Sequence, residues 1–244
     1  MEVTLVTGTG EEYLLTGSER TSKVLAPEGA LVSLTGEAER SDLAVPARSG
    51  VVPGKRRFKP VDTTIEFLLV AESHEEMERL YWSFRRAWLK TVAAKDPAPC
   101  VFRIDGARGT FFVDAVLGGV LPGVDVEPAR RLSMRLEVPV FNARGLARSA
   151  AFVQSGTVTV TNTGDGVIYP KIRRNGTYGY IVSPSGARFY AGTKMPDVID
   201  TDPMVLREDG IPPEGVEPGD TATWELPGSR IELEWCQLVA DPWG

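Results

Sequence analysis

The chain has 244 residues, of which 42% are hydrophobic and 25% are charged, and its formal net charge is −6. This length supports one large hydrophobic core or two ordinary ones, and the acidic balance argues against a nonspecific nucleic-acid surface, which would be basic. No run approaches the roughly 20 apolar residues of a membrane span, and no secretory signal opens the sequence, so we expect a chain that stays in the cytoplasm where it is made. The 25 glycines and 18 prolines indicate many short strands joined by turns.

The first part of the chain predicts one helix, over residues 73–89. Ser73 followed by Glu76 forms a capping box, and acidic residues precede basic ones as the helix dipole prefers. The apolar residues fall on one stripe at helical spacing, with Tyr81 beside it. The stripe consists of Met77, Leu80, Phe84, Ala87 and Trp88.

Strands are predicted around this helix because the hydrophobic period changes to two. Segment 64–70 places Ile65, Phe67 and Leu69 on one face, and the segment from Leu132 to Val138 alternates in the same way. A hairpin is expected where residues 105–109, DGARG, separate two apolar runs. The predicted strands of this part are 30–34, 64–70, 100–104, 110–117 and 131–138. Residues 1–140 therefore read as an α+β or mainly β domain.

Residues 141–150 show neither period and are predicted as a linker, because acidic bias and proline content rise after them. Residues 151–244 read as a β-sandwich. The segment 155–176, SGTVTVTNTGDGVIYPKIRRNG, predicts two strands around a tight turn, and Pro170 suggests that the returning strand is an edge. The segment 221–238 predicts a C-terminal hairpin whose apolar side chains face a core. These are Ala222, Trp224, Leu226, Ile231, Leu233 and Trp235.

Candidate catalytic residues are few. His74 is the single histidine and is interpreted as a solvated surface residue. Asp197, Asp200 and Asp202 suggest calcium ligands or glycosidase carboxylates, but their spacing does not match a calcium loop, and acidic turn residues explain them as well. A glycosidase or other hydrolase that uses Asp200, Asp202 or Glu225 is left open. We predict no catalytic site, metal or cofactor.

The two cysteines, Cys100 and Cys236, are interpreted as small core residues, because they are too few and too distant for a disulfide framework or a zinc site.

Two groups of side chains are candidate binding residues. The basic run Lys55, Arg56, Arg57 and Lys59 is a candidate partner interface, although a solvated loop also explains it. Tyr178 and Tyr180 lie in a segment with Phe189 and Tyr190, and these rings are candidates for stacking on sugars or for packing in a core or an interface.

The order of these features resembles the distal tail protein, or minor tail protein, family of long-tailed phages (siphophages). The resemblance lies in the strand and capped helix of residues 63–89, the linker, and the second-domain tracts YPKIRRNG (169–176), GARFYAG (186–192) and DVIDTDPMVL (197–206).

The resemblance implies a tail-tube-like first domain that forms a hexameric ring and a galectin-like second domain. It also implies a structural virion protein at the tail tip, assembled in the host cytoplasm, that joins the tail tube to tape measure, hub and baseplate proteins and in some cases a receptor-binding protein. The second domain leaves little room for a glycan-binding insertion. A carbohydrate-binding adhesin remains the alternative function.

Overall fold

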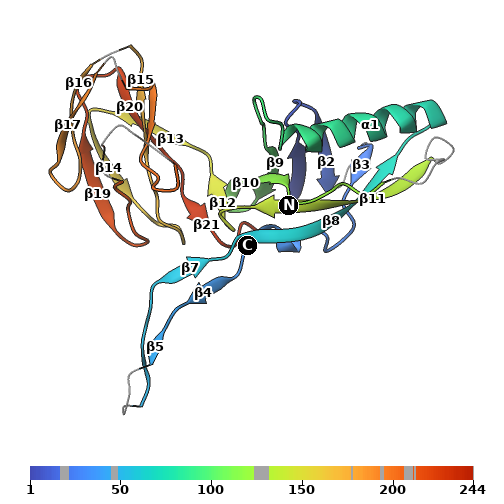
Figure 1. The fold of residues 1–244 in the computed structure, drawn as a ribbon, viewed down its shortest axis with the longest axis horizontal. Helices are drawn as coiled ribbons and strands as arrows, with labels where there is room; N and C mark the ends of the chain where they lie inside the picture. The colour runs from blue at the N-terminus through green and yellow to red at the C-terminus, as the bar shows by residue number, and fades with distance from the viewer. Residues whose placement is uncertain are drawn as a thin grey trace. The chain divides into compact units, whose positions relative to one another are not determined.

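The structure is a computed structural model, and it describes residues 1–16, 22–44, 49–123, 132–176, 178–192, 195–205, 211 and 213–243. The chain forms two compact units, Met1–Ala147 with Ala240–Gly244 and Arg148–Val239. Most regular structure is β-strand, and a single α-helix occurs in the described part of the chain (Figure 1). The prediction of a mainly β chain with one helix is confirmed. Among the described residues, no helix has the length and apolar character needed to cross a membrane.

Unit 1 is built on one antiparallel sheet in the order β2-β1-β9-β10-β11-β8-β3. The long central strands alternate between buried and exposed side chains, as the predicted period of two requires. Their bounds are β1 Glu2–Val6, β2 Glu12–Thr16, β3 Val24–Leu25, β8 Val61–Val70, β9 Cys100–Gly106, β10 Gly109–Leu117 and β11 Ser133–Asn142.

Helix α1 (His74–Lys90) lies across one face of this sheet (Figure 1). The Ser73 hydroxyl accepts a hydrogen bond from the Glu76 amide, as the capping box predicts. The Glu76 carboxylate accepts the Glu72 amide at 2.8 Å. All six residues of the predicted apolar stripe and its flank are buried, and Phe84 and Trp88 pack against aromatic rings of the sheet.

Three local predictions in unit 1 are wrong. Residues 30–34 do not form a strand, because Leu31 and Leu34 are both buried at a spacing of three and a 3₁₀ turn, η1 (Val32–Leu34), brings them to the same side. The β9–β10 loop is shorter than five residues, since Gly106 pairs with Gly109 and only two residues remain in the turn. Leu132 is 50% exposed and precedes β11, so it does not join the alternation that begins at Met134.

Much of the segment predicted as a linker is regular structure. Strand β11 continues to Asn142, and β12 (Ala147–Ser149) pairs with β21 (Leu238–Val239). At the end of β11, the buried Asn142 side-chain amide donates to the carbonyl oxygens of Leu34 and Leu146 at 3.2 and 3.3 Å. The last residues, Ala240–Gly244, belong to unit 1 and not to the second unit.

Unit 2 contains two four-stranded antiparallel sheets, in the orders β13-β20-β15-β18 and β14-β19-β16-β17. Side chains from both sheets form one buried cluster that includes Val158, Ile172, Trp224 and Leu233. The strands are β13 Phe152–Ser155, β14 Thr157–Thr161, β15 Lys171–Arg174, β16 Gly179–Val182, β17 Arg188–Ala191, β18 Val198–Asp200, β19 Thr221–Glu225 and β20 Ile231–Trp235.

Both hairpins predicted in unit 2 are wrong, although the strands and their buried faces are as predicted. β14 and β15 belong to different sheets, and so do β19 and β20. β15 lies between β20 and β18, so it is not an edge, and Pro170 precedes the strand. Each connection crosses from one sheet to the other, which lets consecutive strands bury their apolar faces in the same core from opposite sides.

The loop between β14 and β15 is held by a buried side chain. The Asn162 amide donates to the carbonyl oxygens of Gly166 and Val216 at 2.8 and 2.7 Å, and its oxygen accepts the Gly164 amide at 2.9 Å. A Cβ on Gly164 would lie 2.4 Å from the Leu238 carbonyl oxygen, so the close approach of the backbones requires glycine. This stretch therefore maintains the shape of unit 2.

Candidate interaction surfaces

The residues considered for catalysis lie in different local environments. His74 is exposed at the start of α1, and Asp197 has a side chain that is 85% exposed. Asp200 pairs with Lys171 at 3.0 Å, whereas the buried Asp202 accepts the Met204 amide at 2.9 Å. Glu225 is exposed on β19. Within the described ranges, no three His, Cys, Asp or Glu side chains are grouped so that they could hold a metal ion.

The cysteines differ in environment. Cys100 is fully buried, and burial raises the pKa of its thiol to about 11, which disfavours the nucleophilic thiolate. Cys236 is only half-buried, so the interpretation as a core residue fits Cys100 better than Cys236.

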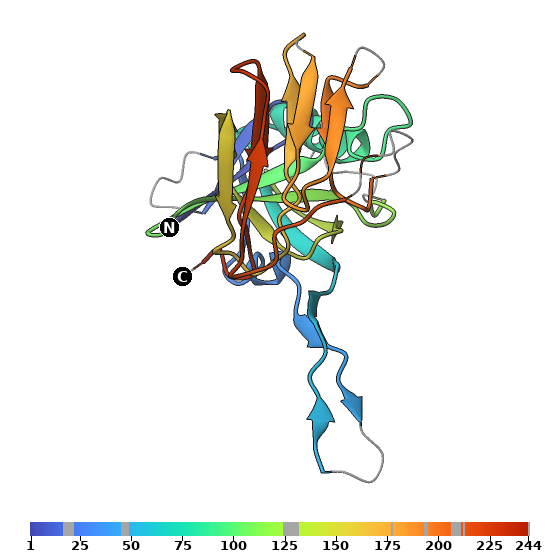
Figure 2. The ribbon, with the colours of Figure 1, turned by 90° about the vertical axis from the view of Figure 1, so that its left-hand side faces the viewer.

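The predicted basic run lies on two paired stretches of unit 1, residues 36–44 and 49–60, which we call the arm. Its strands are β4 (Ala38–Arg40), β5 (Leu43–Ala44), β6 (Val51–Val52) and β7 (Arg56–Phe58), with β4 paired to β7 and β5 to β6. Figures 1 and 2 both show the arm projecting away from the sheet of unit 1. Every residue of these four strands is exposed except Phe58, which is half-buried.

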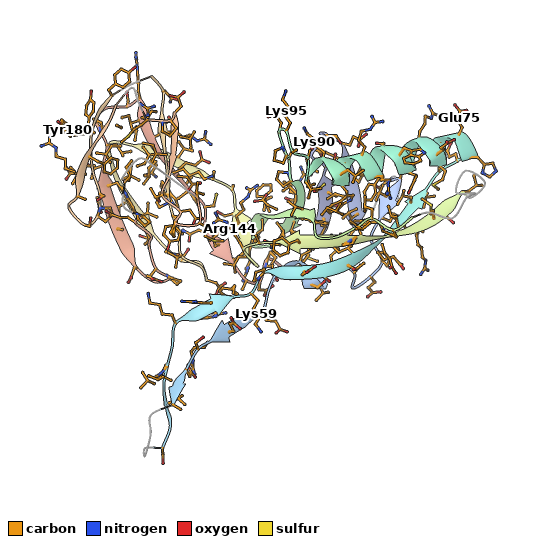
Figure 3. The ribbon with its side chains drawn as sticks, in the orientation of Figure 1. Lys59, Glu75, Lys90, Lys95, Arg144 and Tyr180 are labelled. Carbon is orange, nitrogen blue, oxygen red and sulfur yellow. The ribbon has the colours of Figure 1, made fainter. Side chains whose placement is uncertain are left out.

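The described basic side chains of the arm lie on its surface. The Arg56 guanidinium lies over the Phe58 ring, 4.6 Å from its centroid, and Lys59 pairs with Glu39 at 3.3 Å. Arg40 forms a two-point ion pair with Asp42, whose pKa is lowered by the Arg40 hydrogen bonds and by the Gly54 amide. Lys59 lies where the arm joins the sheet of unit 1 (Figure 3).

The root of the arm is defined by three backbone segments in close contact. The Gly36 amide donates to the Gly145 carbonyl oxygen at 2.7 Å, and the Lys59 amide donates to Glu37 at 3.0 Å. A Cβ on Gly36 or Gly145 would lie 2.0 or 1.9 Å from the Lys59 carbonyl oxygen. Gly145 also has a φ of +63°, which glycine adopts without strain. The arm therefore leaves the sheet from a tightly built base.

A second surface lies on the outer face of β16 and β17. Tyr180 is directly opposite Tyr190, with ring centroids 5.1 Å apart, and the Arg188 guanidinium lies 4.1 Å from the centre of the Tyr180 ring. The Tyr190 ring also lies close to Gly192, since a Cβ there would meet it at 2.9 Å. Tyr178 precedes β16. We call Tyr178, Tyr180, Arg188 and Tyr190 the tyrosine patch.

The tyrosine patch is exposed. Tyr178, Tyr180 and Tyr190 are 49%, 53% and 51% exposed, because Ile181 and Ala191 occupy the inward positions of the two strands. The core interpretation of Tyr178 and Tyr180 is therefore wrong, whereas a surface interaction remains open. Figure 3 shows Tyr180 directed outward from its strand.

One structural residue was not predicted from the sequence. The Arg174 side chain is 4% exposed, and its guanidinium donates to the carbonyl oxygens of Pro196 at 2.9 Å, Gly192 at 2.6 Å and Met195. The signal was available, because a period of two places Arg174 on the same inward face as Ile172, whereas Arg173 points outward.

The sequence and the fold can be compared with those of known proteins. No protein-family model and no curated protein matches the sequence. The structure is similar to the SPP1 Dit (gp 19.1) protein, described as a paradigm of the hub adsorption apparatus in phages that infect Gram-positive bacteria. The TM-score is 0.51 at 10% identity, with coverage of 97% of this chain and 98% of that chain.

Two structures of a phage P2 baseplate in its activated conformation are also similar. The calcium form gives a TM-score of 0.55 at 10% identity and covers 97% of both chains. The strontium form gives 0.52 at 9% identity, with coverage of 96% of this chain and 97% of that chain. The chain therefore shares its fold, over nearly its whole length, with hub and baseplate components of phages.

Proposed function

We propose that this chain is a structural protein of the tail tip of a long-tailed phage. It belongs, on this proposal, with the siphophage distal tail proteins that its sequence resembles. The observation that carries the proposal is the fold match to phage hub and baseplate chains, which covers at least 96% of this chain and at least 97% of each of those chains.

In this role, unit 1 is the tail-tube-like domain that forms a hexameric ring, and unit 2 is the galectin-like β-sandwich that supports other tip proteins. The ring joins the tail tube to the tape measure and hub proteins, and a receptor-binding protein docks in turn on the tip. A ring of identical subunits uses a heterologous interface that closes on itself, which requires complementary surfaces on each copy and no substrate pocket.

The proposal is tested by imaging the purified full-length chain by negative-stain electron microscopy and by antibody labelling of virions. We expect rings with sixfold symmetry and labelling confined to the distal end of the tail. Particles without rings at every protein concentration, together with unlabelled virions, would refute the proposal. A sixfold ring that labels elsewhere on the virion would refute only the location.

Carbohydrate binding is the second candidate function, and exposure of the tyrosine patch favours it. Exposed tyrosines stack on sugar rings, although Arg188 already covers one face of Tyr180. A glycan array probed with the wild-type chain and with the Tyr178→Ala and Tyr180→Ala variants tests this function. Binding that both substitutions abolish would support it, and an array without signal would remove it.

A further inference from the structure

The turn that follows β15 contains the only Asn–Gly pair in the sequence, Asn175 and Gly176. Both residues are exposed, and they lie between β15 in one sheet of unit 2 and β16 in the other. In an Asn–Gly pair, the backbone nitrogen of the glycine can reach the side-chain carbonyl carbon of the asparagine, because glycine has no Cβ to obstruct the approach. The pair is therefore a candidate site of covalent modification.

The two reacting groups of this turn are loosely held. The Asn175 side-chain amide donates to the Glu232 carboxylate at 3.4 Å, which is longer than the usual N–H···O distance of about 2.7–3.2 Å. Among the described residues, none accepts a backbone hydrogen bond from the Gly176 amide, and a Cβ added to Gly176 would meet no described atom within 4 Å. The nitrogen is therefore accessible, and the Asn175 side chain can rotate toward it.

The two other asparagines of the chain are held firmly. Asn142 and Asn162 are 3% and 1% exposed, and the side-chain amide of each donates to two carbonyl oxygens. Their side-chain oxygens accept the backbone amides of Arg144 at 3.1 Å and Gly164 at 2.9 Å. Neither asparagine precedes a glycine. Rotation of either side chain would leave buried polar groups unpaired, so the fold protects both.

We propose that Asn175 is a site of spontaneous deamidation in the folded protein. The Gly176 backbone nitrogen loses its proton to hydroxide and forms a bond to the Asn175 Cγ atom. The bond from Cγ to Nδ2 breaks, the departing nitrogen takes up a proton from water, and ammonia leaves behind a cyclic succinimide. Water then opens the ring at the Cγ carbonyl, which gives aspartate, or at the main-chain carbonyl, which gives isoaspartate. The net reaction consumes water and releases ammonia.

The modification changes both charge and backbone in unit 2. It replaces the amide that donates to Glu232 by a carboxylate, and neighbouring like charges on paired strands are destabilising. An isoaspartate also lengthens the main chain directly before Gly176, whose φ is +68°, and beside the hydrogen bond from the Asn175 amide to the Arg230 carbonyl oxygen at 3.0 Å. We therefore expect the converted chain to be less stable. The inference is independent of the proposed ring function.

Incubation of the full-length chain, followed by proteolysis and peptide mass analysis, tests the proposal. The incubation is carried out in water enriched in heavy oxygen, which labels each residue converted during that period and distinguishes it from conversion during sample handling. A synthetic peptide of residues 171–180 in the same solution reports the rate of the sequence without the fold. Asn142 and Asn162 are internal controls, and the Asn175→Gln variant, which keeps a side-chain amide, is the control for melting temperature.

We expect the peptide that contains Asn175 to gain about 3 Da, because a hydroxyl group with heavy oxygen replaces the NH₂ group. Conversion at Asn175 should be at least about tenfold faster than at Asn142 or Asn162, since the buried asparagines react only after local opening. The rate should rise with pH, because the attacking nitrogen must lose its proton. Incubated wild type should melt at a lower temperature than fresh wild type, whereas incubated Asn175→Gln should melt as it did when fresh.

Three results would count against this assignment. If Asn175 keeps its mass while the synthetic peptide is converted, the fold protects the turn and the proposal fails. Equal rates at Asn142, Asn162 and Asn175 in the folded chain would overturn it as well, because exposure and the following glycine would then not select the site. If the converted wild type melts at the same temperature as the fresh protein, the assigned effect on unit 2 is overturned.

Discussion

Replacing Gly145 by alanine is expected to destabilise unit 1 by disturbing the root of the arm. The new Cβ would lie 1.9 Å from the Lys59 carbonyl oxygen, and the backbone φ of +63° disfavours any side chain. The left-handed conformation costs roughly 1–2 kcal/mol for a non-glycine residue. Relieving the overlap by shifting the backbone adds about 1–3 kcal/mol. We therefore expect the free energy of unfolding to fall by about 2–5 kcal/mol.

Two other glycines separate these contributions. Gly10 has a φ of +89°, and a Cβ added there would have no atom within 4 Å, so Gly10→Ala reports the conformational cost alone. Gly36→Ala reports the overlap alone, since its Cβ would lie 2.0 Å from the same Lys59 oxygen without a positive φ. The Gly36→Ala/Gly145→Ala double variant should cost less than the sum, because both substitutions displace one carbonyl group.

Urea unfolding monitored by circular dichroism measures these free energies, and hydrogen exchange of the arm amides locates the change. We expect exchange to accelerate at residues 36–60 in Gly145→Ala and Gly36→Ala but to remain unchanged there in Gly10→Ala. If Gly145→Ala and Gly10→Ala lose equal stability and the arm amides exchange at the wild-type rate in both, the backbone contact at the root does not hold the arm.

Three further predictions concern buried and paired groups. Arg174→Ala should lower the free energy of unfolding by about 2–5 kcal/mol, because three carbonyl groups lose a charged donor, whereas the outward-facing Arg173→Ala should cost about 0–1 kcal/mol; equal losses in chemical denaturation would contradict this. The pKa of Glu234 is lowered chiefly by its hydrogen bond from Arg173, so this pair stabilises the fold above the ordinary value of 4.5 and the contribution is lost as the pH falls through the lowered pKa. Melting temperatures of Glu234→Gln and wild type should therefore differ at neutral pH and converge in acid, and a constant difference would exclude the linkage. Because burial raises the pKa of Cys100 to about 11, iodoacetamide at mildly alkaline pH should modify it only after unfolding, whereas the half-buried Cys236 should react earlier in the same sample, as peptide mass analysis would report.

Local periodicity was sufficient to predict the elements that are amphipathic by themselves. The capped helix α1, the buried faces of β8 and β11, and the inward tryptophans of β19 and β20 all follow from spacing alone. Each depends on interactions between residues that are close in sequence, which is why the pattern is readable there. The strand prediction for residues 30–34 was wrong because two leucines at a spacing of three fit both a short strand and a 3₁₀ turn.

The candidate surfaces were only half predictable. The sequence identified the basic residues and the rings of Tyr178, Tyr180 and Tyr190, but it did not indicate that the basic run lies on a projecting arm. It also did not indicate that Tyr190 lies opposite Tyr180 or that Arg188 covers the Tyr180 ring. The arm and the neighbours of Tyr180 depend on cross-strand register, which brings together residues that are separated in the sequence.

Composition and alternation by themselves determined that this protein is mainly β and which face of its strongly amphipathic segments enters the core. Only the tertiary structure decided which strands pair, because an amphipathic strand can satisfy the same pattern in either sheet. β14 and β15, and likewise β19 and β20, therefore lie in opposite sheets of unit 2 although each pair reads as a hairpin. The same reason explains the arm, whose exposed strands bury almost nothing locally and whose position is set by the backbone contacts at its root.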